Sequence, residues 1–125
     1  MRLLLDTQIY LWCVNADNAL SKQAKCIISD ASEVFVSSVS LWEMAIKIKL
    51  GKLEANLTEL VKAIESSHFI ELPLTAKHAA ATLELPHLHR DPFDRIMIAQ
   101  ALSEPLRFIT CDKALADYSD LIMTV

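Results

Sequence analysis

Short apolar runs that lead to carboxylates constrain this chain more than any other feature of its sequence. Three such runs are each followed by an acid, namely Leu3–Leu5 by Asp6, Val34–Val36 by Glu43 after a serine-rich stretch, and Phe108–Thr110 by Asp112. A fourth acid, Asp94, stands just before the helical run 96–102. Carboxylates that a fold gathers in one place repel each other, so such a cluster usually binds a cation.

Helical patterns alternate with the strand-like runs along the whole chain. The predicted strands are residues 2–5, 33–37, 68–72, 107–110 and 121–125. The predicted helices are residues 21–29, 40–50, 58–67, 75–84 and 94–103, with a short one near 113–117. This order predicts an α/β fold with a mainly parallel sheet of about five strands and helices on both faces. Parallel sheets bind ligands at the carboxyl ends of their strands, where we expect all four acids to lie.

Composition indicates a single cytoplasmic domain, residues 1–125. The three cysteines lack metal-ligand spacing and are predicted to be reduced, buried thiols. No apolar stretch approaches the roughly 20 residues of a membrane helix, and the apolar opening is too short for a signal peptide. The net charge of −4 argues against nucleic-acid binding by bulk charge but permits a local basic rim. The apolar content of 53% suits a sheet covered on both faces, or surplus apolar surface for a partner or a second copy.

Each of the four acids also has a structural interpretation at the start of a helix. Asp6 and Asp112 could be N-caps, and Asp94 could stabilise the positive end of a helix. Ser40 and Glu43 match a capping box. Taken one at a time, these interpretations are favoured. Taken together, the four acids favour a shared site, because helix caps have no need to converge.

Asp91 stands between the two interpretations. It precedes Pro92 at the start of a predicted helix, which is typical of an N-cap, and it could instead be an outer residue of the site. Thr58 and Thr75 are further cap candidates. No capping role needs a bound ion.

A set of oxygen ligands selects a hard divalent ion, Mg²⁺ or Mn²⁺. Mg²⁺ retains several waters and binds substrate phosphate, which suits phosphodiester chemistry. The sequence predicts no zinc site, since joint ligand spacing is missing among the four histidines, His68, His78, His87 and His89. The acids therefore predict a magnesium or manganese site.

These residues resemble the motifs of PIN-domain proteins, and specifically of the VapC-type toxins of bacterial toxin–antitoxin pairs. Residues 3–7 (LLLDT) are similar to the first motif, residues 37–47 (SSVSLWEMAIK) to the second and residues 109–112 (ITCD) to the fourth. Residues 89–95 (HRDPFDR), followed by Ala-Gln-Ala, are similar to the third motif of one large subgroup. The motifs occur in the expected order across nearly the whole chain.

The resemblance implies a three-layer α/β/α PIN-like domain and a Mg²⁺- or Mn²⁺-dependent endoribonuclease. It implies that Asp6 and Asp94 are the principal metal ligands, and that Glu43 and Asp112 complete the site directly or through water. It also implies an RNA substrate, an inhibitory antitoxin and a homodimer. One departure is Gln8, where many relatives of the subgroup carry histidine, so we expect an effect on substrate preference rather than on activity.

Other residues near the motifs have weaker assignments. Arg90 and Arg95 are predicted to form a basic rim that receives RNA phosphates, while Lys49 and Lys52 are assigned to solvated helix faces. Lys47 could form an ion pair with Glu43 one helical turn away.

Threonines and aromatic residues beside the acids remain ambiguous. The hydroxyls of Thr7 and Thr110 could hydrogen-bond a carboxylate or only nearby backbone. Trp12, Trp42 and Phe93 are expected in the core, although they could stack on unpaired bases.

Two other functions stay open. A metal-dependent phosphatase would use Asp6 as its nucleophile, but Gln8 stands where a paired aspartate would be expected. A catalytically inactive PIN-like domain could bind a partner through its apolar surface, but it would not need the four acids.

Overall fold

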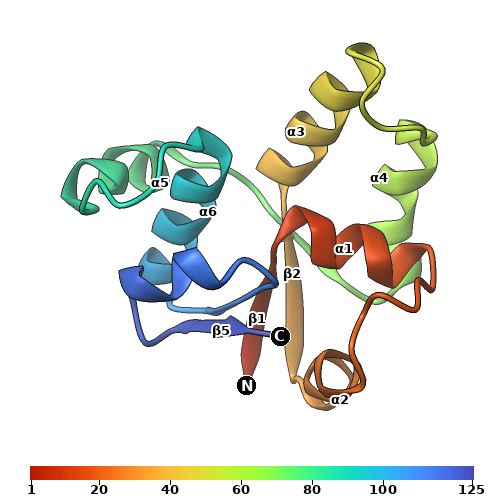
Figure 1. The fold of residues 1–125 in the computed structure, drawn as a ribbon, viewed down its shortest axis with the longest axis horizontal. Coiled ribbons are helices and arrows are strands. Elements are labelled where there is room, and N and C mark those ends of the chain that lie inside the picture. The colour runs from red at the N-terminus through yellow and green to blue at the C-terminus, as the bar shows by residue number, and fades with distance from the viewer.

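Five parallel strands form the centre of the computed structural model, which describes residues 1–125 (Figure 1). They are β1 (Arg2–Leu5), β2 (Glu33–Ser37), β3 (Ile70–Leu72), β4 (Arg107–Thr110) and β5 (Ile122–Thr124). Their order in the sheet is β3-β2-β1-β4-β5, and every neighbouring pair is parallel. The predicted α/β fold with a five-stranded parallel sheet is confirmed.

Helices connect these strands. They are α1 (Thr7–Val14), α2 (Lys22–Asp30), α3 (Ser38–Lys49), α4 (Leu57–Ser66), α5 (Ala76–Ala81) and α6 (Pro92–Ser103), with 3₁₀ turns at Thr82–Glu84 and Lys113–Tyr118. None of the helices combines the length and the apolar character that crossing a membrane requires.

The side chains of β1 show why the strand is a continuous apolar run. Leu3 and Leu5 pack in a core cluster with residues of α1, α2 and α4, whereas Leu4 packs in a second cluster with residues of α6 and β4. Successive side chains of a strand point to opposite faces, so both faces of β1 are buried. Helices α5 and α6 lie on one side of the sheet, and α1, α2 and α4 on the other (Figure 1).

The chain changes direction in the sheet at β1. From this central strand it moves outward through β2 to β3, and then returns to place β4 on the other side of β1. Such a switch point opens a crevice at the carboxyl ends of the two strands that flank it. Asp6 directly follows β1 and Asp112 lies two residues after β4, so both acids stand at this crevice.

Helix α1 was not among the predicted helices. Its sequence, TQIYLWCV, is rich in β-branched and aromatic residues and has almost no amphipathic pattern, because Thr7, Ile9, Tyr10 and Leu11 are all buried. Asp6 begins the helix by accepting a hydrogen bond from the Thr7 N–H at 2.7 Å. Burial on several sides removed the periodicity that sequence analysis depends on.

Two of the predicted caps are wrong. Helix α3 begins after Ser37, not Ser40, so Glu43 belongs to no capping box. Helix α4 is capped by Asn56 rather than Thr58. The prediction of Thr75 is confirmed, since its hydroxyl accepts from the His78 N–H.

Ser37 joins the two helices that carry acids of the site. Its hydroxyl accepts from the Val39 N–H at 3.0 Å as the cap of α3, and donates to Gln100 Oε1 of α6 at 2.6 Å. Ser37→Ala would remove the cap and leave a buried amide oxygen without its donor. We expect a loss of about 2 kcal/mol in the free energy of unfolding, measured by urea titration. Ser66→Ala, at an exposed position of α4, should change it by less than about 0.5 kcal/mol.

Candidate metal-binding active site

Asp6 is the innermost acid of the site. It is 8% exposed, and its two carboxylate oxygens accept hydrogen bonds from the Thr7 N–H and the Thr110 hydroxyl, both at 2.7 Å. Burial raises the pKa of Asp6, as do the charges of Glu43 and Asp112, while these two hydrogen bonds lower it. The residue is thus both the N-cap of α1 and a carboxylate held at the crevice.

Glu43 reaches the same place from α3. It is 6% exposed, and its carboxylate accepts from the Thr7 hydroxyl at 2.7 Å and from Lys47 Nζ at 2.8 Å. The expected pairing of Glu43 with Lys47 is present. The threonine hydroxyls therefore bond to carboxylates, Thr7 to Glu43 and Thr110 to Asp6.

Asp94 lies at the start of a helix, as predicted, and not at the end of a strand. It follows no strand, because it lies in the first turn of α6, and this helix precedes β4. Asp91 caps the helix by accepting from the N–H groups of Phe93 and Asp94, at 2.9 and 3.3 Å. Of the two interpretations of Asp91, the cap is confirmed, and its side chain also lines the cleft of the site.

Asp112 is the most open of the four acids, with its side chain 44% exposed. One carboxylate oxygen accepts from the Ala114 N–H at 3.0 Å, as an N-cap does. The other faces Nε2 of His89 at 3.7 Å, and Nδ1 of the same ring lies 3.9 Å from Asp94. His89, Asp94 and Asp112 each offer a ligand atom within 4.8 Å of the others.

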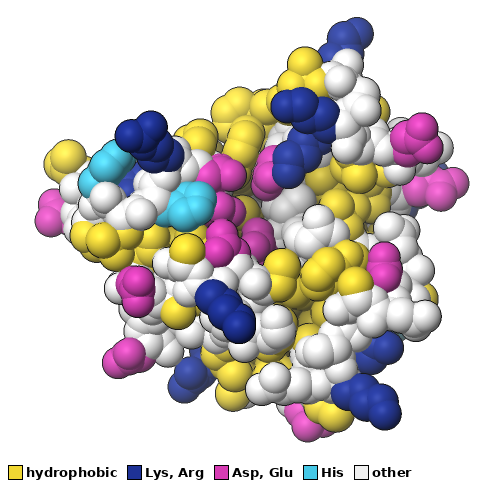
Figure 2. Space-filling model, viewed as in Figure 1, with side chains coloured by type: hydrophobic (Ala, Val, Ile, Leu, Met, Phe, Trp, Pro, Cys, Tyr) yellow, Lys and Arg dark blue, Asp and Glu magenta, His cyan; other side chains and the backbone are white.

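A cleft of about 280 Å³ is lined by three of the four predicted acids, Asp6, Glu43 and Asp94. The carboxylate of Asp91 and the two cations Lys47 and Lys52 also line it. Figure 2 shows acidic side chains gathered near the middle of this face, with histidine on one side and Lys or Arg side chains on the other. The sequence assigned Lys52 to a solvated helix face, but it lies at the edge of this cleft.

Crowding of the carboxylates has its largest effect on Asp94. Burial, and then the charges of Asp6, Asp91, Glu43 and Asp112, raise its pKa from 3.8 to about 8. No hydrogen bond offsets these effects. A carboxyl group in this position resists ionisation until a cation compensates the surrounding negative charge.

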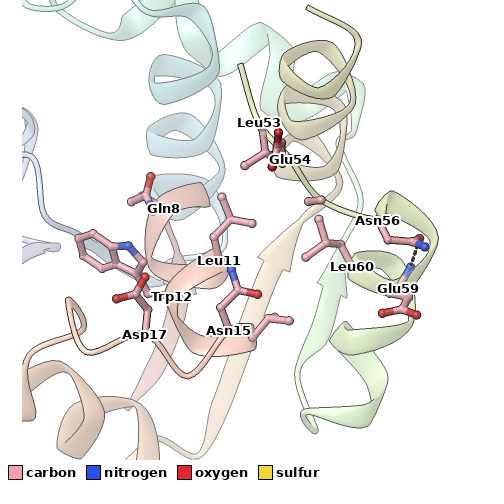
Figure 3. Close-up of a pocket in the computed structure, with 12 residues that line it drawn as sticks. Gln8, Leu11, Trp12, Asn15, Asp17, Leu53, Glu54, Asn56, Glu59 and Leu60 are labelled. Atoms are coloured by element: carbon pink, nitrogen blue, oxygen red, sulfur yellow. Dashed lines mark hydrogen bonds between the residues drawn. The ribbon is translucent and has the colours of Figure 1, made fainter. Parts of the chain in front are cut away.

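A second cleft, of about 260 Å³, continues from the first. Gln8, Leu11 and Leu53 line both clefts, and the second extends between α1 and the segment that leads into α4 (Figure 3). Its other lining residues include the acids Asp17, Glu54 and Glu59 together with Trp12 and Leu60. Gln8 therefore lies where the acidic site opens into a longer groove.

Two expectations for neighbouring residues are wrong. Arg95 forms no free rim, because its guanidinium donates to the carbonyls of Pro86 and Thr82 and to the Tyr118 hydroxyl. Trp42 is not a core residue: it is 56% exposed and contacts the Phe93 ring edge-on, with 5.1 Å between ring centroids. Both residues help to hold the segment before α6 and the first turn of that helix.

The donor set fits a hard divalent ion. Asp6 and Asp94 line the same cleft, and Asp94 and Asp112 offer ligand atoms within 4.8 Å of each other. Each of these three carboxylates has at least one unused lone pair. Both oxygens of Glu43 are already engaged by Thr7 and Lys47, so this residue suits contact through water. Lone-pair oxygens in this number are typical of Mg²⁺ or Mn²⁺ rather than of zinc or copper.

Comparison with known families identifies the fold. The model of the PIN domain matches residues 3–121. The chain belongs to the PIN domain family. The predicted resemblance is therefore confirmed at the level of the PIN domain, while membership of the HRDPFDR subgroup stays a prediction.

Individual PIN-domain relatives support the resemblance to VapC-type proteins. Ribonuclease VapC22 of Mycobacterium tuberculosis is 26% identical over 117 residues, which cover 92% of this chain and 90% of that protein. The crystal structure of VapBC2 from Rickettsia felis, bound to a promoter DNA fragment, superposes with a TM-score of 0.75 at 17% identity, covering 99% of this chain and 98% of that one. VapC20 of M. tuberculosis, a toxin that cleaves the sarcin-ricin loop, superposes with a TM-score of 0.61 at 14% identity, covering 92% and 93%.

Proposed function

We propose that this PIN domain is a metal-dependent endoribonuclease that acts as the toxin of a toxin–antitoxin pair. Asp6, Glu43, Asp94 and Asp112 hold Mg²⁺ or Mn²⁺ and carry out the hydrolysis. The observation that carries the proposal is the convergence of these acids, from four separate segments of the chain, at the switch point of the sheet. The relative VapC22 is itself a ribonuclease.

The bound ion would supply Lewis-acid chemistry, offsetting negative charge on the scissile phosphate and making a water molecule more acidic. Asp6 and Asp94 would fix its position, because both line the cleft, Asp6 as a buried residue after β1 and Asp94 as a half-buried residue in the first turn of α6. Asp112 is the better candidate for the group that orients and deprotonates the attacking water, since one of its oxygens is free and it is open to solvent. The Glu43 carboxylate is held in one orientation by hydrogen bonds from Thr7 and Lys47, so it would contact the ion through water.

Single-stranded RNA is the substrate form that suits this site best. The cleft is open and carries lysines at its edge, and the exposed Trp42 ring lies beside Phe93 at the start of α6. Unpaired bases can stack on such a ring. The products carry a 5′-phosphate and a 3′-hydroxyl, as the family resemblance implies.

Cleavage of a fluorescent single-stranded RNA tests the proposal. We expect the purified chain to cleave it with Mn²⁺ or Mg²⁺ and to leave it intact in EDTA, with activity returning when excess Mn²⁺ is added. Gel analysis of RNA labelled at either end shows the position of the cut. Absence of cleavage at every ion concentration, with the chain folded by circular dichroism, would contradict the proposal.

The proposal includes two protein partners, a cognate antitoxin and a second copy of the chain in the cytoplasm. One structure similar in fold is a toxin–antitoxin complex from Klebsiella pneumoniae, with a TM-score of 0.67 at 18% identity over 98% of this chain and 96% of that one. Several large apolar side chains are exposed, among them Leu50, Val61, Leu83 and Leu88. Light scattering of the chain, alone and with the product of the adjacent gene, measures both associations. A monomer at high concentration that binds no such product would remove this part of the proposal.

A further inference from the structure

One side chain with ligand chemistry lies inside the site and has no role in the proposed mechanism. His89 is the first residue of the HRDPFDR stretch, and its imidazole is half-buried between Asp94 and Asp112. Its Nδ1 lies 3.9 Å from an Asp94 oxygen and its Nε2 lies 3.7 Å from an Asp112 oxygen. The spacing of the four histidines does not reveal this residue, because His89 lies beside two acids and not beside another histidine.

These separations suit a single ion. Two atoms that each bind one ion at about 2.1 Å lie at most about 4.2 Å apart. The pair formed by His89 Nδ1 and Asp94 meets this limit as it stands. Asp112 lies against the other ring nitrogen, with its carboxylate oxygen 3.7 Å from Nε2.

The hydrogen bonds of the ring indicate which nitrogen would bind. The Asp91 N–H donates to Nδ1 at 3.1 Å, so in the neutral ring Nδ1 carries the lone pair and Nε2 carries the proton. The Nε2–H group then faces the Asp112 carboxylate. A carboxylate behind a metal-binding imidazole is a common arrangement, which fixes the ring and makes its ligating nitrogen more basic.

We propose that His89 is a nitrogen ligand of the divalent ion in this site, bound through Nδ1 together with Asp94 and supported by Asp112. The ion replaces the hydrogen bond from the Asp91 N–H. This inference rests on the proposed function for the presence of the ion, and it adds a selectivity that four carboxylates alone would not give.

The consequence is a preference for Mn²⁺ over Mg²⁺. Imidazole suits transition-metal ions, whereas Mg²⁺ strongly prefers oxygen ligands and retains its waters. With His89 in place, the site offers Mn²⁺ one nitrogen and at least two carboxylates. Without it, the remaining oxygen ligands should distinguish the two ions much less.

Pulsed electron paramagnetic resonance of bound Mn²⁺ tests the ligand directly. The chain labelled with ¹⁵N-histidine should show a directly coupled ¹⁵N nucleus, and His89→Ala should lose that coupling. Titration of each protein with Mn²⁺, and competition with Mg²⁺, gives the two dissociation constants. We expect His89→Ala to weaken Mn²⁺ binding by about 10- to 100-fold and to change Mg²⁺ binding by less than about threefold.

His87→Ala is the matched control, because His87 is exposed and lies two residues away outside the cleft. It should keep both the coupling and the selectivity. His89→Asn, which can still accept from the Asp91 N–H, separates loss of the ligand from loss of loop structure: it too should lose the nitrogen coupling. Thermal unfolding in EDTA checks that each variant folds.

Wild-type protein that binds Mn²⁺ without histidine coupling, or a His89→Ala variant with unchanged Mn²⁺ and Mg²⁺ constants, would overturn the inference. In that case cleavage of RNA with Mn²⁺ would still support the proposed function. If wild-type protein binds neither ion, the inference and the metal-dependent function both fail. The two failures are therefore distinguishable.

Discussion

Asp94→Asn is expected to lower metal-dependent RNA cleavage by at least about 100-fold while leaving the protein folded. Asparagine keeps the shape of the side chain but cannot supply the negative charge that a divalent ion requires from this position. The loss should appear in single-turnover cleavage of a labelled RNA at saturating Mn²⁺. Asp6→Asn should behave in the same way, and asparagine caps α1 about as well as aspartate does.

Stability measurements separate this result from simple unfolding. In EDTA at pH 9, where Asp94 is ionised, the Asp94→Asn variant should be more stable than wild type, because it removes a charge that four neighbouring carboxylates repel. Loss of a favourable charge at the start of α6 offsets about 0.5 kcal/mol of this gain. Asp120→Asn, an exposed acid outside the site, should change neither cleavage nor stability by a measurable amount. Wild-type cleavage by both Asp94→Asn and Asp6→Asn would mean that the site is assigned wrongly.

The second large effect is a fall in the stability of the metal-free protein as pH rises. The pKa of Asp94 is 3.8 in the unfolded chain and about 8 in the folded one, so between these values the folded state binds more protons. The free energy of unfolding then decreases with rising pH, by up to about 1.4 kcal/mol per pH unit for one proton. The contribution of Asp94 is complete below pH 4 and is lost as pH rises through about 8.

Urea unfolding in EDTA at several pH values from 5 to 9 measures this slope. In the same series for Asp94→Asn, the free energy of unfolding should fall less steeply with pH. The difference in slope should be up to about 1.4 kcal/mol per pH unit, which corresponds to one proton. Saturating Mn²⁺ should reverse the trend, because the ion binds the ionised site and releases a proton, which calorimetry in buffers of different ionisation enthalpy detects. A metal-free wild-type slope identical to that of Asp94→Asn would show that Asp94 is not held protonated.

Much of the fold was predictable because strands that are buried on both faces have continuous apolar sequences. Strands β1, β2 and β4 were predicted to the residue, since each is a short apolar run that ends at a polar residue. Helix α1 was missed for the opposite reason. Its buried sides left no polar face, so its composition matches a strand as well as a helix.

The candidate site was predictable in its acids but not in its geometry. The sequence placed Asp94 at the start of a helix, as found, but it grouped this acid with those that follow strands, whereas α6 precedes β4 in the chain. His89 and Lys52 were not assigned to the site, because His89 lies just before α6 and Lys52 just after α3, and only the packing of these two helices brings both residues to the acids. The prediction of Ser40 as a cap was wrong because a capping box depends on where the helix begins. Helix α3 begins at Ser38, and its N-cap is Ser37.

The pairing of β1 with β4 also sets the order in which this side of the site can form during folding. The hydrogen bond from the Thr110 hydroxyl to Asp6 joins residues that are 104 positions apart in the sequence. A contact of this kind requires closure of a long loop before it contributes any stabilisation. The carboxylate of Asp6 therefore receives this support only once β4 has paired with β1.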